Sequence, residues 1–135
     1  MKLNYKKILV FDFETTGLSP KNDKVIEVGA VLLEKVNEQF VVSQELNYLI
    51  KQEKPISDFI SNLTNITNEM LETEGVSEEH AFRQLDSLID ADTLLVAYNL
   101  GFDIGFLSSL YKYYVARNYL ITNDILDCMA VYKDR

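Results

Sequence analysis

Cysteine, histidine and tryptophan are nearly or wholly missing from this chain of 135 residues, which has one cysteine, one histidine and no tryptophan. The single cysteine, Cys128, permits no internal disulfide and fits a reducing compartment. There is no histidine and cysteine cluster of the kind that binds zinc. Internal repeats, low-complexity segments and linkers are also missing, so residues 1–135 are expected to form a single domain.

Basic side chains are fewer than acidic ones. The chain has 13 Lys and Arg and 21 Asp and Glu, so its net charge is −8. This balance argues against a broad surface that coats nucleic acid, but it allows an enzyme that meets phosphates through bound metal. Long apolar runs are missing too, since Asp12 interrupts the run that follows Lys6 and Lys7. No signal peptide or membrane span is predicted, and we expect a soluble, cytoplasmic protein. Neither a P-loop nor a dinucleotide-binding glycine motif is present.

The most informative stretch that is present runs from Ile8 to Gly17, Ile-Leu-Val-Phe-Asp-Phe-Glu-Thr-Thr-Gly. Its apolar start predicts a buried strand, and alternation along a strand places Asp12 and Glu14 on one face. Two carboxylates about 5 Å apart repel by about 3 kcal/mol at an effective dielectric near 20, and only a cation or a proton relieves this. The alternative is a pair of solvated acids without function. A second acidic element elsewhere would decide between them.

Further along, the pattern changes from strands to helices and back. The periodicity predicts strands over 24–33 and 40–50 with a loop over 34–39, and helical segments over 56–63 and 67–72. Ser77 is positioned to cap a further helix. After it we expect a strand over 93–98, a helix from Asn99 onward, a short strand over 119–122 and a last helix over 124–132. The order predicts an α/β fold with a mixed sheet flanked by helices.

Asp103 is the second acidic element. It follows the predicted strand 93–98 and lies near the start of the next helix. If that strand runs parallel to the first, Asp103 converges with Asp12 and Glu14 at one edge of the sheet. Three carboxylates in a cleft suit hard divalent cations such as Mg²⁺ or Mn²⁺. The alternative for Asp103 is that it only complements the helix dipole.

Two of these stretches resemble motifs of the DEDD 3′–5′ exonuclease superfamily, of the DEDDh type found in the proofreading epsilon subunit of bacterial DNA polymerase III. Residues 11–20, Phe-Asp-Phe-Glu-Thr-Thr-Gly-Leu-Ser-Pro, are similar to its first motif. Residues 96–107, Val-Ala-Tyr-Asn-Leu-Gly-Phe-Asp-Ile-Gly-Phe-Leu, are similar to its second. Weaker similarity covers residues 25–31, 54–56, 63–71 and 125–127, so the resemblance spans nearly the whole chain.

The resemblance implies a ribonuclease H-like fold with a mixed five-stranded sheet. It also implies metal-dependent release of nucleoside monophosphates from nucleic-acid 3′ ends, in DNA proofreading or repair. Asp12, Glu14 and Asp103 would be the catalytic residues and the ligands of a two-metal site for Mg²⁺ or Mn²⁺.

The same resemblance implies a set of substrate contacts. Thr15, Thr16 and Gly17 would hold the terminal nucleotide, while Asn99 and Phe102 would support the acidic site or touch the substrate. The expected partner is a nucleic-acid 3′ end, with DNA favoured over RNA.

The third motif of the family, which supplies a histidine general base and a fourth aspartate, has no counterpart here. The only histidine, His80, lies before the second motif and is expected at the surface. We therefore expect a C-terminally incomplete exonuclease-like domain that lacks a C-terminal helix, exposes apolar surface and shows weak or no turnover alone. Its expected partners include a DNA polymerase subunit or a polypeptide that supplies the third motif. The alternative is a non-catalytic, polymerase-associated binding module, or one part of a split nuclease.

Overall fold

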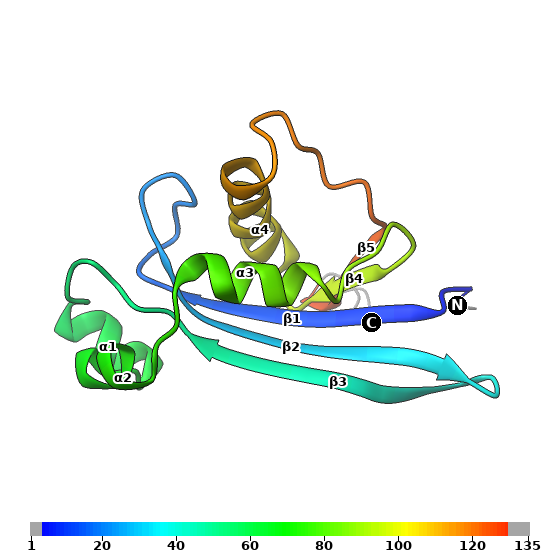
Figure 1. Ribbon diagram of the computed structural model, residues 1–135, viewed down its shortest axis with the longest axis horizontal. Helices are drawn as coiled ribbons and strands as arrows, with labels where there is room; N and C mark the ends of the chain where they lie inside the picture. The colour runs from blue at the N-terminus through cyan, green and yellow to red at the C-terminus, as the bar shows by residue number, and fades with distance from the viewer. Residues whose placement is uncertain (1–3, 130–135) are drawn as a thin grey trace.

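The computed structural model of the chain describes residues 4–129, in which five strands form one mixed sheet in the order β3-β2-β1-β4-β5 (Figure 1). The strands are β1 Lys7–Thr15, β2 Val25–Val36, β3 Gln39–Leu49, β4 Leu94–Ala97 and β5 Ile125–Asp127. β1, β2 and β3 form an antiparallel meander, whereas β4 pairs in parallel with β1, and β5 in parallel with β4. The predicted mixed five-stranded sheet, and the parallel pairing of its first and fourth strands, are confirmed.

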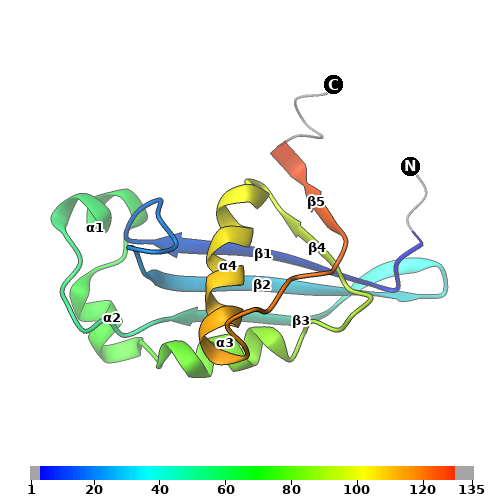
Figure 2. The same cartoon turned by 90° about the horizontal axis from the view of Figure 1, so that it is seen from above.

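The helices are α1 Asp58–Thr64, α2 Asn68–Glu74, α3 Glu78–Asp86 and α4 Leu100–Tyr114. α3 and α4 lie over one face of the sheet, and α1 and α2 lie beyond the end of β3 (Figures 1 and 2). A hydroxyl oxygen caps each of the first three helices, and the predicted cap by Ser77 is confirmed by its bond from the backbone N–H of His80. None of the helices within residues 4–129 is long and apolar enough to cross a membrane.

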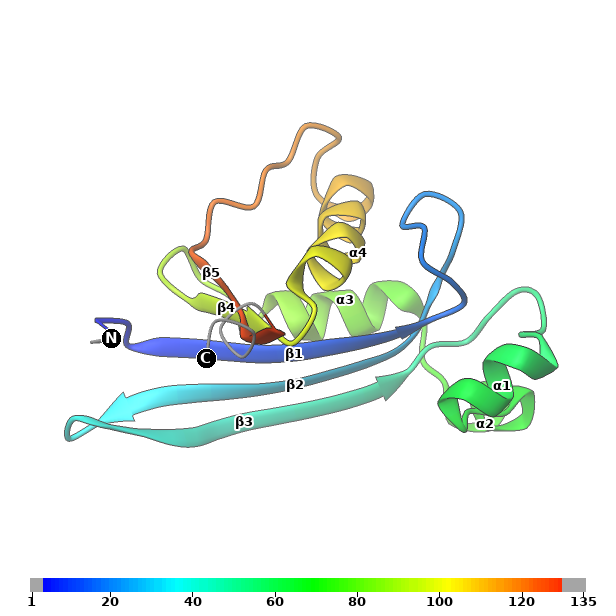
Figure 3. The same ribbon diagram turned by 180° about the vertical axis from the view of Figure 1, so that it is seen from behind.

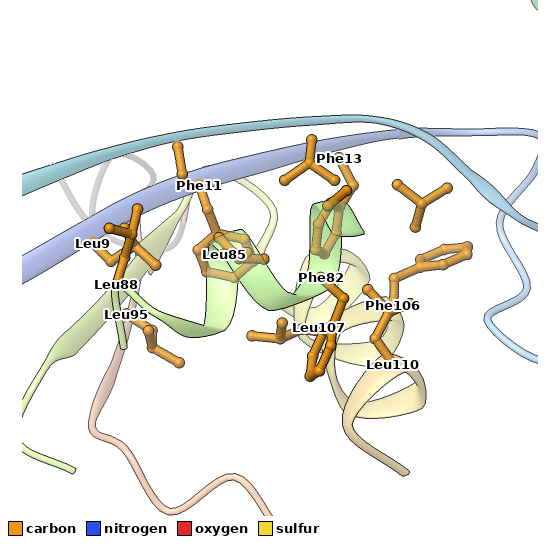
Figure 4. Close-up of a cluster of buried hydrophobic side chains, with 14 of the residues drawn as sticks. Leu9, Phe11, Phe13, Phe82, Leu85, Leu88, Leu95, Phe106, Leu107 and Leu110 are labelled. Atoms are coloured by element: carbon orange, nitrogen blue, oxygen red, sulfur yellow. The ribbon is translucent and has the colours of Figure 1, made fainter. Parts of the chain in front are cut away.

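β1 divides its side chains between the two faces of the sheet. Phe11 and Phe13 are buried and point toward α3 and α4 (Figure 4). Asp12 and Glu14 occupy the alternate positions, where Asp12 is exposed and Glu14 is half-buried. The side chains that pack with the two phenylalanines in the main core include Leu9, Phe82, Leu85, Leu88, Leu95, Phe106, Leu107 and Leu110. This packing fixes the direction in which the two acids of β1 face.

The turn between β2 and β3 is tighter than the sequence predicted. Residues 34–36 continue β2, so the expected loop over 34–39 shrinks to Asn37 and Glu38. Both residues have positive φ, 51° and 66°, as in the two-residue hairpin turns that match the twist of the flanking strands. The prediction failed because a polar run was read as a loop, although those residues pair along the exposed end of the hairpin.

The C-terminal predictions were partly wrong: the expected strand is absent and the expected helix begins only at Cys128. Residues 119–122 form no strand, and the ring of Tyr119 instead stacks on Tyr111 with centroids 4.4 Å apart. The helix expected over 124–132 is replaced by β5 over its first part, while residues 130–132 lie outside the described residues. A run as short as Ile125–Asp127 fits a strand or a helix equally well, and parallel pairing with β4 decides for the strand here (Figure 3).

Candidate metal centre

Asp12 and Glu14 lie on β1, on the side opposite Phe11 and Phe13. Asp12 is open to solvent on one side only, and the desolvation that its neighbours still impose raises the pKa of its carboxyl above the usual range. Desolvation also raises the pKa of Glu14, and the charges of Asp12 and then Glu27 raise it further. The charge of Asp12 therefore acts on Glu14, in line with the predicted placement of both acids on one face of the strand.

Asp103 reaches the same region from the first turn of α4. Its side chain is buried, with 2% of its surface exposed, and its Oδ1 accepts a hydrogen bond of 3.1 Å from the backbone N–H of Phe13. β4 pairs with β1 only as far as Val10, so this N–H lies past the end of that ladder. Asp103 thus occupies the edge position that a longer β4 would fill. A residue that only complemented the helix dipole would need no contact with β1.

Burial makes Asp103 the most perturbed acid of the group. Desolvation raises the pKa of its carboxyl from 3.8 to about 7, and the charges of Asp12 and Glu14 act in the same direction. The hydrogen bond from Phe13 opposes this rise but does not cancel it. Deprotonation therefore leaves a buried charge within electrostatic reach of two others of the same sign, an arrangement that a cation would relieve. The structure thus brings the three predicted acids into one electrostatic group.

The donor chemistry of this group fits a hard divalent cation. Asp12, Glu14 and Asp103 offer only carboxylate oxygens, the ligands that Mg²⁺ and Mn²⁺ prefer. Their positions are nevertheless not closed around an ion. Within residues 4–129, no set of three or more His, Cys, Asp or Glu side chains is already placed to hold a metal. A cation would have to draw the carboxylates together, so the group is a candidate centre and not a preformed cage.

Asp12 also borders open space on its face of the sheet. A shallow hollow of about 660 Å³ is lined by Asp12 together with Val10, Val31, Asn47 and Tyr98. Its floor is largely apolar, and Tyr98 is 64% exposed beside it. A ligand could therefore approach Asp12 from this side without moving the main core.

The predicted substrate residues of the first motif form a tight turn. The Thr15 hydroxyl donates to the carbonyl of Gly17 at 2.6 Å, and the Thr16 hydroxyl donates to Asp23 Oδ1 at 3.2 Å. The Thr16 oxygen also accepts from the backbone N–H of Lys24 at 2.9 Å. Both hydroxyls are thus engaged within the loop itself. The Thr16 N–H also donates to the carbonyl of Lys24 at 2.9 Å. Contact between this turn and a terminal nucleotide stays a prediction.

Asn99 and Phe102 lie around the start of α4. Asn99 is exposed, and its carbonyl accepts from the N–H groups of Phe102 and Asp103, while its side chain makes no capping bond. The ring of Phe102 is half-buried and lies 5.1 Å from that of Phe106. Both residues adjoin Asp103 along the helix, and their contact with substrate stays a prediction.

Glu27 also acts on the group, although the sequence does not single it out. β2 is an interior strand, and Glu27 stands directly opposite Glu14 in the register. No spacing along the chain could show this, since the pairing depends on where β2 meets β1. His80, in contrast, is exposed as predicted, with its ring edge-on to Tyr48 at 5.4 Å.

Comparison with known proteins identifies the family. A family profile described as Exonuclease (RNase_T) matches residues 9–134. The chain belongs to this exonuclease family. DNA polymerase III PolC-type of Pediococcus pentosaceus is 36% identical over 125 residues, which are 93% of this chain and 8% of that protein. The 3′-5′ exonuclease DinG of Bacillus subtilis is 36% identical over 133 residues, which are 96% of this chain and 13% of that protein.

The exonuclease domain thus spans no more than 13% of the length of these two relatives. Among solved structures, E. coli exonuclease I in complex with single-stranded DNA, in a zinc-bound form, matches with a TM-score of 0.78. The match covers 97% of this chain and 30% of that one at 19% identity. At this identity it shows that the two chains share the ribonuclease H-like fold. Exonucleases of this family use divalent metals.

Proposed function

We propose that this exonuclease domain binds Mg²⁺ or Mn²⁺ through Asp12, Glu14 and Asp103 and releases nucleoside monophosphates from 3′ ends. The observation that carries the proposal is the buried Asp103 carboxylate, which accepts from the N–H of Phe13 and feels the charges of the two acids of β1. Such an arrangement is unfavourable at neutral pH unless a cation or a proton is present. DNA is favoured over RNA as substrate because the relatives are a DNA polymerase and a 3′-5′ exonuclease. A polymerase subunit as partner and a cytoplasmic location form part of the same proposal.

A pair of bound divalent ions would supply an activated water and would stabilise the leaving 3′ oxygen. The residues of the chain provide the rest. The N–H of Phe13 holds the Asp103 carboxylate at the edge of β1, and the packing of Phe11 and Phe13 turns Asp12 toward open space. The turn over residues 15–17 follows these acids directly along the chain and would contact the terminal nucleotide.

Binding without turnover is the second candidate function. Two observations favour it: the acids of residues 4–129 are not closed around a metal position, and the only histidine, His80, packs on Tyr48. Without a general base, a rate falls by about 10²- to 10⁴-fold. The domain would then hold a 3′ end or a partner and leave the chemistry to another segment or polypeptide.

Release of labelled nucleotides from 3′-labelled single-stranded DNA with Mn²⁺ tests the proposal. We expect slow release that stops in EDTA and falls by at least about 100-fold in Asp12→Asn, because a carboxylate ligand is lost. Asp92→Asn serves as the matched control, since Asp92 is exposed between α3 and β4. Release that persists in EDTA or in Asp12→Asn would contradict the proposal. Metal-dependent binding of the DNA without any release would establish the second candidate.

A further inference from the structure

The loop between β1 and β2 is braced by one side chain that the motif does not include. Asp23 Oδ2 accepts from the backbone N–H of Ser19 at 2.9 Å, and its Oδ1 accepts from the Thr16 hydroxyl at 3.2 Å. The N–H of Asp23 also donates to the carbonyl of Ser19 at 2.7 Å. Both carboxylate oxygens are therefore used, one on each side of Gly17. Bonds to a charged acceptor are among the stronger ones in proteins.

Gly17 and Asp23 fit together closely. A Cβ atom built on Gly17 would lie 2.4 Å from Oδ2 and 2.7 Å from Oδ1 of Asp23. The carboxylate cannot move aside without giving up its bonds to Thr16 and Ser19, so any side chain at position 17 displaces the brace. Glycine is required here by the nearness of Asp23 and not by a positive φ, since the glycines of the described residues have none.

The braced loop also rests on the helix that carries Asp103. The ring of Pro20 lies so close to α4 that a Cβ on Gly105 would be 3.0 Å from its Cγ. The hydroxyl of Ser109 donates to the carbonyl of Pro20 at 3.5 Å. The position of the turn relative to α4 thus depends on the shape that Asp23 imposes on the loop.

We propose that Asp23 is a positioning residue, which sets the backbone of the turn over residues 15–17 so that it can receive a terminal nucleotide. The inference rests on the proposed function, because the turn is a nucleotide contact only in a nuclease of this kind. The hydrogen bonds of the Asp23 carboxylate go to Thr16 and Ser19 and not to the proposed metal ligands. The acids are held independently of it, Asp12 by the strand and Asp103 by Phe13.

The affinities for Mn²⁺ and for nucleotide distinguish a positioning role of Asp23 from a role in stability alone. Loss of Asp23 leaves the metal ligands in place, so Mn²⁺ affinity stays while nucleotide affinity falls. A residue that only stabilised the loop would lower the unfolding midpoint, yet the folded protein would bind nucleotide as tightly as before.

The test is calorimetric titration of the 135-residue chain, first with Mn²⁺ and then, in saturating Mn²⁺, with thymidine 5′-monophosphate. In Asp23→Ala we expect nucleotide affinity to fall by about tenfold or more and Mn²⁺ affinity to stay within about twofold, since two bonds to a charged group are lost. Asp23→Asn should recover most of the affinity, because its amide oxygen can still accept from Ser19. Asp92→Ala, an exposed acid outside the loop, is the matched control and should match wild type in both titrations.

Equal nucleotide affinity in wild type and Asp23→Ala would overturn the inference, as would loss of Mn²⁺ binding in Asp23→Ala. If Mn²⁺-loaded wild type binds no nucleotide, the proposed function fails and the positioning role fails with it. A second measurement tests the contact between Gly17 and Asp23 whether or not nucleotide binds. Gly17→Ala should lower the urea midpoint in wild type and lower it much less in Asp23→Ala, where no carboxylate blocks the new methyl group. Equal effects in the two backgrounds would show that Asp23 does not brace Gly17.

Discussion

Asp103→Asn is expected to unfold less readily than wild type at pH 8 in the absence of metal, by up to about 4 kcal/mol. The reason is the raised pKa of the buried carboxyl, about 7 in the folded chain against 3.8 for the ordinary group. Each pH unit between these values costs about 1.4 kcal/mol of stability. Asparagine remains neutral, and its side-chain oxygen can still accept the bond from Phe13.

The direction of the pH dependence follows from the same values. Between pH 4 and pH 7 the folded chain keeps the Asp103 proton and the unfolded chain releases it, so unfolding loses a proton. The stabilisation is fully present below pH 4 and is lost as the pH rises through about 7. Raised pKa values at Asp12 and Glu14 act in the same sense.

Urea unfolding in EDTA at several pH values between 4.5 and 8 measures this effect. Wild type should weaken up to about pH 7 and then level off, and Asp103→Asn should weaken much less. Asp58→Asn is the control, because Asp58 is an exposed acid in the first turn of α1 with no comparable burial. A wild-type curve that is flat or rises with pH would show that Asp103 is not held as a buried acid beside two others.

Phe82→Ala is expected to lower the free energy of unfolding by about 3–5 kcal/mol, a large share of the 5–15 kcal/mol typical of a domain. Phe82 is 1% exposed on α3, and its ring meets Tyr111 edge-on at 5.0 Å and stacks with Tyr114 at 5.3 Å. Both tyrosines belong to α4, so this ring joins the two helices that cover the sheet (Figure 4). Because α4 carries Asp103, metal affinity should fall together with stability.

Urea unfolding measures the first effect and Mn²⁺ titration of the folded variant measures the second. Tyr113→Ala removes an aromatic ring from the same helix and serves as the control, since Tyr113 is 80% exposed. A loss in Phe82→Ala no greater than in Tyr113→Ala would mean that α3 and α4 are not joined through this ring.

Much of the fold was predictable because β1, β4 and α4 have strong local patterns. The run from Ile8 to Phe13 is apolar at its start and then alternates, and the sheet uses it as predicted. The expected convergence of Asp103 with Asp12 depended on one assumption, that the first and fourth strands pair in parallel, and the structure confirms this pairing. Predictions for short segments failed, because the conformation of a run such as 125–127 is set by its pairing with β4 and not by its own residues.

The supporting residues of the site could not be predicted for a related reason. Glu27 acts on Glu14 only through the register of β2 against β1, and Asp23 acts on Thr16 only after the loop has closed. Neither contact leaves a periodic or spaced signal in a single sequence. The acids themselves could be predicted from the sequence, because a charged residue inside an apolar strand conflicts with burial. Such conflicts often mark functional sites.

Calorimetric titration of wild type and Asp12→Ala with Mn²⁺ tests most directly whether these carboxylates form a metal centre, with Asp58→Ala as the control. We predict saturable binding to wild type and to Asp58→Ala, and none to Asp12→Ala. Equal binding to all three would place the metal elsewhere, and no binding to wild type would contradict a centre formed by Asp12, Glu14 and Asp103 in this chain.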